Sequence, residues 1–138
     1  MRVFLDSDVL LDYLTARQPF LSEIKIIIHM GIRSEIELHT SSLVIANIHY
    51  FIKKVENHKK AIAKIEKLLQ FIRVLSVSEK EIQEAIKSNF KDFEDAIQNF
   101  TALNSKVDVL VTRNIKDFKL SSLPILTPTE FLAKIETQ

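Results

Sequence analysis

The chain has 138 residues, of which 46% are hydrophobic and 27% charged, a composition that predicts one folded domain over residues 1–138 and excludes a disordered chain. It contains no cysteine, which excludes disulfide bonds and zinc–thiolate sites, and its single glycine excludes the glycine-rich loops that bind nucleotide phosphates. Nineteen basic and 18 acidic residues give a net charge of +1, so overall charge does not mark a nucleic-acid-binding protein.

The first half of the chain alternates between short apolar runs and segments with helical spacing. Arg2–Leu5 is an apolar run that an acidic residue ends, and this pattern predicts a buried strand. Leucines over residues 10–14 predict a helix, and a second helix is expected over Phe20–Ile32, with Gly31 as its C-terminal cap. The other elements expected in this half are a strand over Glu37–Thr40 and helices over Ser41–Lys54 and Lys59–Phe71.

The second half continues the alternation. Ser78 and Glu81 have the spacing of a capping box, which predicts the start of a helix. Thr127, Pro128 and Glu130 supply a cap, a proline at the first helical position and a glutamate at the third, so a last helix should begin there. The other elements expected in this half are strands over Val74–Val77, Val107–Val111 and Leu123–Leu126, and a helix over Lys91–Asn104.

This order of elements predicts the fold class. Strands separated by helices of this length imply right-handed crossovers and a sheet covered on both faces. We therefore predict an α/β fold, a three-layer α/β/α sandwich around a central, mostly parallel sheet of four to five strands. Asp6 interrupts the apolar opening too early for a secretion signal, so we expect a cytoplasmic protein.

Acidic side chains follow the strands at the edge where an open parallel sheet has its functional crevice. Asp6 and Asp8 come directly after the first strand, Asp95 lies near the start of a helix, and Asp117 follows a later strand. Clustered carboxylates repel one another unless a cation lies among them, and oxygen ligands suit Mg²⁺ or Mn²⁺. Each acid also has a structural interpretation as a helix cap, a first-turn residue or a solvated loop residue, and spacing alone leaves both open.

Two segments together carry a family resemblance. The first is the opening run Val3–Asp12, and the second extends from Asp92–Ala96 to Val109–Phe118, which includes a Thr-Arg-Asn sequence followed by Asp117 and a phenylalanine. At this separation they resemble the PIN domain family, which includes the toxin ribonucleases of VapBC-type toxin–antitoxin pairs. The resemblance covers essentially the whole chain.

The resemblance implies a divalent-metal-dependent endoribonuclease that cleaves RNA phosphodiester bonds as the toxin of a toxin–antitoxin pair. Mg²⁺ or Mn²⁺ would be the cofactor, with Asp6, Asp95 and Asp117 as the metal-binding and catalytic residues. RNA would be the substrate, and the partners would be a cognate antitoxin and a second copy of the chain. The residues expected in supporting roles are Asp8, Asn47, Thr112, Arg113 and Asn114.

One position departs from the family pattern. The family has a glutamate on the helix after the second strand, where this chain has Asn47. Asparagine keeps a carbonyl oxygen but lacks the negative charge, so it attracts a metal ion less strongly. The alternative function is therefore a catalytically weakened or inactive PIN-like module that binds RNA or a protein partner.

Phosphate contacts could come from two places. Arg113 lies close to the proposed metal site in sequence, which makes it the first candidate. The helices expected over 41–54 and 59–71 also carry many basic side chains, which either bind phosphates or form a solvated helix face. These residues are Lys53, Lys54, His58, Lys59, Lys60, Lys64 and Lys67.

Overall fold

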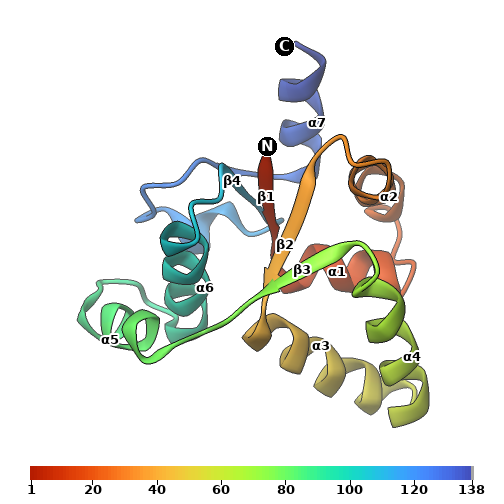
Figure 1. The fold of residues 1–138 in the computed structure, drawn as a ribbon, viewed down its shortest axis with the longest axis horizontal. Coiled ribbons are helices and arrows are strands. Elements are labelled where there is room, and N and C mark those ends of the chain that lie inside the picture. Colours follow the sequence, from red (N-terminus) through yellow and green to blue (C-terminus); the bar gives the residue numbers. More distant parts are fainter. Residues whose placement is uncertain (138) are drawn as a thin grey trace.

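A sheet of five parallel strands forms the centre of the computed structural model, which describes residues 1–137 (Figure 1). The strands are β1 (Arg2–Leu5), β2 (Glu37–Ser41), β3 (Ile72–Leu75), β4 (Val109–Val111) and β5 (Ile125–Leu126). Their spatial order is β3-β2-β1-β4-β5, so the first strand of the chain is the central one. The expected parallel sheet is confirmed.

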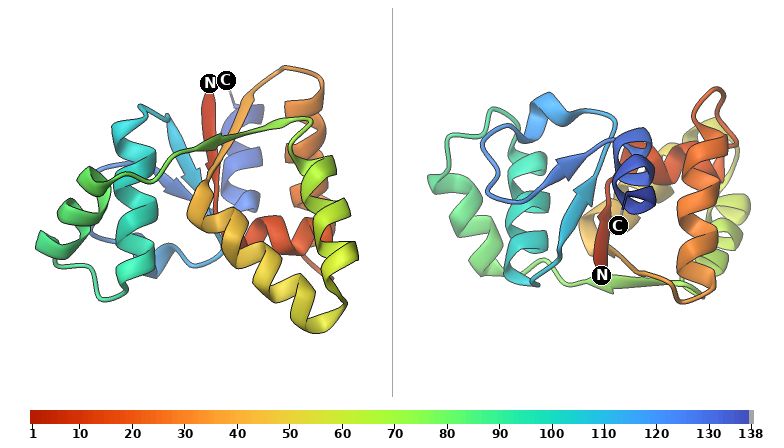
Figure 2. Two further views of the ribbon diagram at one scale, coloured as in Figure 1. Left: turned by 60° about the horizontal axis from the view of Figure 1, so that its bottom comes forward. Right: turned by 90° about the horizontal axis from the view of Figure 1, so that it is seen from above.

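Helices cover both faces of this sheet. The α-helices within the described residues are α1 (Ser7–Leu14), α2 (Leu21–Ile32), α3 (Ser42–Val55), α4 (His58–Leu68), α5 (Glu79–Lys87), α6 (Phe93–Asn104) and α7 (Pro128–Glu136), and η1 (Ile115–Phe118) is a 3₁₀ helix. Figures 1 and 2 show α5 and α6 on one side of the sheet, and α1 to α4 with α7 on the other. The fold is therefore the expected α/β sandwich. In the part of the chain described, no helix has the length and apolar character needed to cross a bilayer.

β1 and β4 are buried strands that end at the same level of the sheet. Val3, Phe4 and Leu5 are completely buried, as expected for a parallel strand packed on both faces. In the register of the two strands Leu5 lies opposite Val111, so both strands end at the same level. The residues that follow β1 and β4 therefore start side by side.

The helix caps follow the sequence signals. Both expected capping boxes are present, at Ser78 with Glu81 and at Thr127 with Glu130. Asp92 caps α6, and its carboxylate accepts a hydrogen bond of 2.9 Å from the backbone N–H of Asp95. The helix expected from Lys91 consequently begins two residues later.

The prediction for Gly31 is wrong. This residue lies inside α2, and the helix extends one residue beyond it. A Cβ atom at Gly31 would lie 2.2 Å from Cδ1 of Leu38 in β2. Gly31 is therefore needed because α2 packs closely on the sheet. The left-handed conformation that often follows a helix is adopted instead by Ser34, with φ of 61°.

The strand expected over 74–77 is displaced to β3. This strand lies at the edge of the sheet, where Arg73 and Val74 are exposed, so its residues do not form the apolar run of a buried strand. The helix before it ends at Leu68 and not at Phe71. The last two strands are also shorter than expected, at three and two residues.

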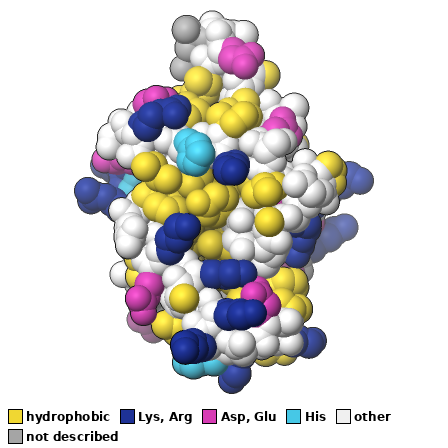
Figure 3. All heavy atoms as spheres, turned by 90° about the vertical axis from the view of Figure 1, so that its right-hand side faces the viewer, with side chains coloured by type: hydrophobic (Ala, Val, Ile, Leu, Met, Phe, Trp, Pro, Cys, Tyr) yellow, Lys and Arg dark blue, Asp and Glu magenta, His cyan; other side chains and the backbone are white. Residues whose placement is uncertain are grey.

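One face of the molecule, formed by α2 and α4, exposes apolar side chains (Figure 3). Ile26 and Ile32 of α2 and Leu69 at the end of α4 are about half exposed. A groove of about 310 Å³ lies nearby, lined by Tyr13, Leu14, Ala16, Leu21, Lys25, Lys64, Lys67, Leu68 and Phe71. This face combines apolar area with positive charge.

Candidate active site at the carboxyl edge of the sheet

Asp6 occupies the junction between β1 and α1. It is only 7% exposed, and its backbone N–H donates to the carbonyl oxygen of Val111 at 3.1 Å, which continues the pairing of β1 with β4. Its carboxylate caps α1 by accepting a hydrogen bond from the N–H of Ser7 at 2.8 Å. The Thr112 hydroxyl donates to the same carboxylate at 3.0 Å. Asp6 thus caps α1 and is also one of the predicted acids at this edge of the sheet. These acids, Asp6, Asp8, Asp95 and Asp117, are called the acidic cluster below.

Asp8 joins α1 to the loop that follows β4. One of its carboxylate oxygens accepts from the backbone N–H of Arg113 at 2.9 Å and from the Thr112 hydroxyl at 3.2 Å. The side-chain amide of Asn114 donates to this oxygen at 3.3 Å. Asp8, Thr112 and Asn114 are therefore brought together in one hydrogen-bond network, which holds the loop against Asp6.

The other two predicted acids come from the opposite side of the sheet. Asp95 is half-buried in the first turn of α6, and Asp117 is exposed in η1. Both line a cavity of about 280 Å³ between these elements. The fold thus brings Asp95 and Asp117 to one opening.

Electrostatics shows that Asp6, Asp95 and Asp117 share one environment. Burial raises the pKa of Asp6 to about 7, and the negative charges of Asp8 and Asp117 add to this rise. Burial likewise raises the pKa of Asp95 to about 7, with repulsion from Asp92, Asp6 and Asp117 as further causes. Burial also raises the pKa of Asp8, although its hydrogen bonds oppose the rise. A cation at this edge of the sheet would relieve the repulsion.

The donor set fits a partly hydrated metal ion. Over residues 1–137, no group of three or more histidine, cysteine or acidic side chains is arranged so that it could hold an ion by itself. Mg²⁺ does not require such a cage, because it keeps several waters and binds through one or two carboxylates together with substrate phosphate. The charge of Asp6 is one of the causes that raise the pKa of Asp95, so these two carboxylates are the candidates for such a pair.

Asn47 lies half-buried in the second turn of α3. This helix starts at the end of β2, the neighbour of β1, so it leaves the sheet at the edge where Asp6 lies. At the same junction the Ser41 hydroxyl caps α3 and donates a hydrogen bond to the side-chain oxygen of Gln98 on α6. Sequence reasoning missed Gln98, whose buried amide ties α6 to the end of β2.

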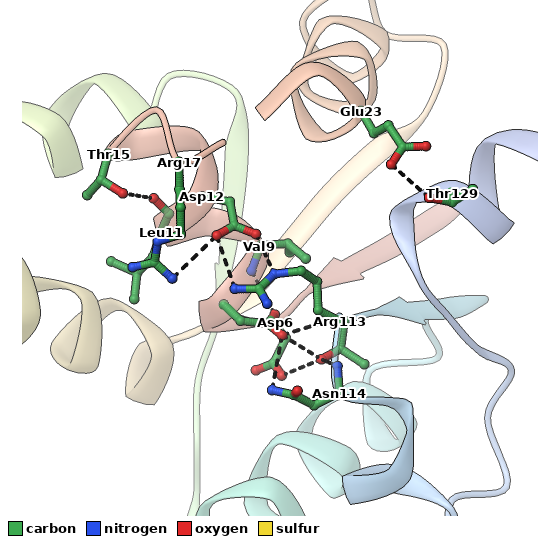
Figure 4. Close-up of polar contacts among 12 residues, drawn as sticks. Asp6, Val9, Leu11, Asp12, Thr15, Arg17, Glu23, Arg113, Asn114 and Thr129 are labelled. Carbon is green, nitrogen blue, oxygen red and sulfur yellow. Dashed lines mark hydrogen bonds and ion pairs between the residues drawn. The ribbon is translucent and has the colours of Figure 1, made fainter. Parts of the chain in front are cut away.

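The side chain of Arg113, the first candidate for a phosphate contact, lies beside α1 (Figure 4). Its guanidinium binds the carboxylate of Asp12 through two hydrogen bonds, of 2.6 and 3.2 Å, and lies 4.0 Å above the ring of Phe20. Asp12 is completely buried, and Arg17 lies 3.5 Å from it. The side chain of Arg113 therefore links the loop after β4 to α1 and to the residue that caps α2.

Sequence reasoning assigned no role to Asp12, although a signal for it was present. Asp8 and Asp12 are four residues apart, so both lie on the same face of α1. Asp8 binds the backbone of Arg113 and Asp12 binds its side chain. An acid at this spacing after Asp8 could have been matched to the single arginine of the loop.

Comparison with known proteins is consistent with this geometry. A family model described as PIN domain matches residues 2–116. The chain is 26% identical over 141 residues to Ribonuclease VapC1 from Aquifex aeolicus (strain VF5), and the match covers 99% of this chain and 96% of the relative.

Solved structures share the fold. DNA-bound VapBC from Salmonella typhimurium matches with a TM-score of 0.71 and 14% identity, over 93% of this chain and 98% of the other. VapBC-1 from nontypeable Haemophilus influenzae matches with a TM-score of 0.68 and 22% identity, over 94% and 99%. Because the family model covers most of the sequence and the structures match nearly its full length, the chain belongs to the PIN domain family.

Proposed function

We propose that this PIN domain is a divalent-metal-dependent endoribonuclease that acts as the toxin of a toxin–antitoxin pair. The observation that carries the proposal is the placement of three acids: Asp6 follows β1, Asp95 and Asp117 line one cavity, and the charge of Asp117 is among the causes that raise the pKa of the other two. A relative described as a ribonuclease and structural neighbours described as VapBC complexes support it. RNA is then the substrate, and an antitoxin protein is the partner.

The roles of the residues follow from their surroundings. A bound Mg²⁺ or Mn²⁺ would neutralise charge on the scissile phosphate and make a bound water a better nucleophile. Asp6 and Asp95 would hold the ion, and Asp117, which is exposed and lines the cavity, would orient the attacking water. The Thr112 hydroxyl keeps the Asp6 carboxylate in position.

Metal binding tests this proposal most directly. Calorimetric titration of Mn²⁺ into the metal-free protein should show saturable binding, which Asp6→Asn removes because asparagine lacks the ionic ligand. Asp108→Asn is the matched control, since Asp108 precedes β4 at the opposite edge of the sheet, where its carboxylate accepts a hydrogen bond from the backbone N–H of Arg2. With Mn²⁺ present, cleavage of a total-RNA preparation should be lost in the same variant and kept in the control.

The opposite result would favour the second candidate function, an inactive module that binds RNA or a protein. Wild-type protein that binds no Mn²⁺ up to millimolar concentrations would contradict the nuclease proposal. The observation behind this alternative is Asn47, a neutral residue at the position where the family has a glutamate.

Asn47→Glu should strengthen Mn²⁺ binding, on the order of tenfold, because an additional carboxylate raises the charge of the ligand set. Asn47→Gln is the control, since glutamine has the same length and no charge. The measurement is again calorimetric. Equal Mn²⁺ affinities for the two variants would show that residue 47 does not face the metal site.

A further inference from the structure

Three lysines are among the residues that line the cavity beside the acidic cluster. Lys91, Lys116 and Lys119 line this cavity together with Asp95 and Asp117. Lys91 comes from the segment between α5 and α6, and the other two come from η1 and the residue after it. All three lysines are exposed to solvent. The fold therefore places positive charges at the opening through which substrate would reach the acids.

We propose that these three lysines, the lysine rim, bind the RNA backbone phosphates on either side of the scissile bond. RNA then crosses the α6 and η1 side of the acidic cluster, and not the lysine-rich face of α3 and α4. The inference rests on the proposed nuclease function and adds the path of the substrate.

The need for nearby positive charge follows from the acids themselves. RNA phosphates are negative, and a cluster of carboxylates repels them. Salt screens charges over about 8 Å at physiological ionic strength, so only cations close to the cluster can offset this repulsion. The lysine rim is the candidate for this role, because it lines the same cavity as Asp95 and Asp117.

The ammonium groups of the lysine rim are also available for phosphate. Ion pairs within 4.0 Å occur elsewhere in the described residues, and none of them involves Lys91, Lys116 or Lys119. A phosphate would therefore not have to displace a carboxylate that already holds one of these side chains. Contacts of this kind position nucleic acid without reading its sequence.

The lysines of α3 and α4 are less well placed. Lys64 is held by Glu56 at 2.7 Å. Lys53 and Lys54 lie in the last turn of α3, which starts at the edge of the sheet and extends away from it (Figure 1). At 1.5 Å per residue, eleven residues of helix place Lys53 about 16 Å along the axis from the first residue, beyond the screening distance.

The test compares two double variants of equal charge change. Lys116→Gln with Lys119→Gln removes two charges from the lysine rim, and Lys59→Gln with Lys60→Gln removes two exposed charges from α4. The probe is a ten-nucleotide single-stranded RNA of mixed sequence. Its binding is followed by fluorescence anisotropy at several salt concentrations, with EDTA present to prevent cleavage. Because all four lysines are exposed, melting temperatures should stay unchanged.

The rim variant should bind this RNA on the order of tenfold more weakly than wild type. Its plot of log K against log salt should be shallower by about 1.4, since each lost single-strand phosphate contact changes the slope by about 0.7. The α4 variant should match wild type in both quantities.

Two results would overturn the inference. RNA that binds the rim variant as tightly as wild type, or that loses equal affinity in both variants, contradicts the lysine rim. Wild-type protein that fails to bind RNA in EDTA also contradicts the rim, whereas the nuclease proposal is decided separately by the Mn²⁺ titration.

Discussion

Asp12→Asn is expected to lower the free energy of unfolding by about 3 kcal/mol, because it breaks a buried ion pair and leaves its partner without a countercharge. The Asp12 carboxylate has no exposure and receives two hydrogen bonds from Arg113, whose side chain is 25% exposed. Asparagine can accept one of these bonds but cannot balance the guanidinium charge. Equilibrium unfolding in urea measures the difference.

Two comparisons make this result specific to the buried pair. Glu35→Gln removes the charge of an exposed pair with Arg33, at 2.8 Å, and should cost less than about 1 kcal/mol. Arg113→Lys keeps the charge but loses the two-pronged geometry, so it should fall between the two. A cost for Asp12→Asn no greater than that of Glu35→Gln would show that the ion pair does not hold the loop.

Asp12→Asn should also disturb the acidic cluster. The backbone N–H of Arg113 binds Asp8, and the neighbouring Thr112 binds Asp6, so the ion pair at Asp12 anchors the loop that carries both contacts. Under the proposed function, a looser loop would weaken Mn²⁺ binding without removing any ligand. Asp12 and Arg113 are therefore positioning residues in this hypothesis.

The sequence was sufficient to predict the sheet edge where the acids lie. β1 was predicted with its observed bounds, because a strand buried on both faces has a distinctive apolar run. Since parallel strands end at one edge, placing Asp6, Thr112 and Asp117 near one another required only the order of the elements. The resemblance to the family added which acids to group.

Other features depend on contacts that a linear pattern does not contain. Asp12 and Arg113 are 101 residues apart. The spacing of Asp12 from Asp8 marks it as a candidate partner of the loop after β4, but charge alone does not select Arg113 in a chain with 19 basic residues. Gly31 was assigned to a cap because glycine often ends helices, whereas its actual reason is the close approach of Leu38 from another element. The bounds of β3 shifted because an edge strand has no buried second face.

Asp6→Asn is expected to stabilise the metal-free protein at pH 8 and to leave its stability almost unchanged near pH 4. Burial, together with the charges of Asp8 and Asp117, raises the pKa of Asp6 from 3.8 to about 7 in the folded state. Between these two values the folded protein holds a proton that the unfolded chain has lost. Stability from this group is therefore lost as pH rises from about 4 to about 7, and asparagine removes the loss.

The size of the gain follows from the same shift. Three pKa units correspond to roughly 4 kcal/mol, and relaxation around the charged form reduces this to an expected 2 to 4 kcal/mol above pH 7. Asparagine can still cap α1, because its side-chain oxygen accepts the hydrogen bond from Ser7. Urea unfolding of both proteins across this pH range gives the difference, in which the contributions of titrating groups outside the acidic cluster cancel, whereas Asp95 titrates together with Asp6. A difference that does not vary with pH would contradict the raised pKa.

Mn²⁺ should narrow the stability difference between the two proteins at pH 8 if the proposed site exists. A ligand that binds only the folded protein stabilises it by about 2.7 kcal/mol at one hundred times its dissociation constant. Wild-type protein at pH 8 should gain this amount with saturating Mn²⁺, whereas Asp6→Asn should gain none. An increase of equal size in both proteins would place the ion away from Asp6. The burial and repulsion that raise the pKa of Asp6 would then be unrelated to metal binding.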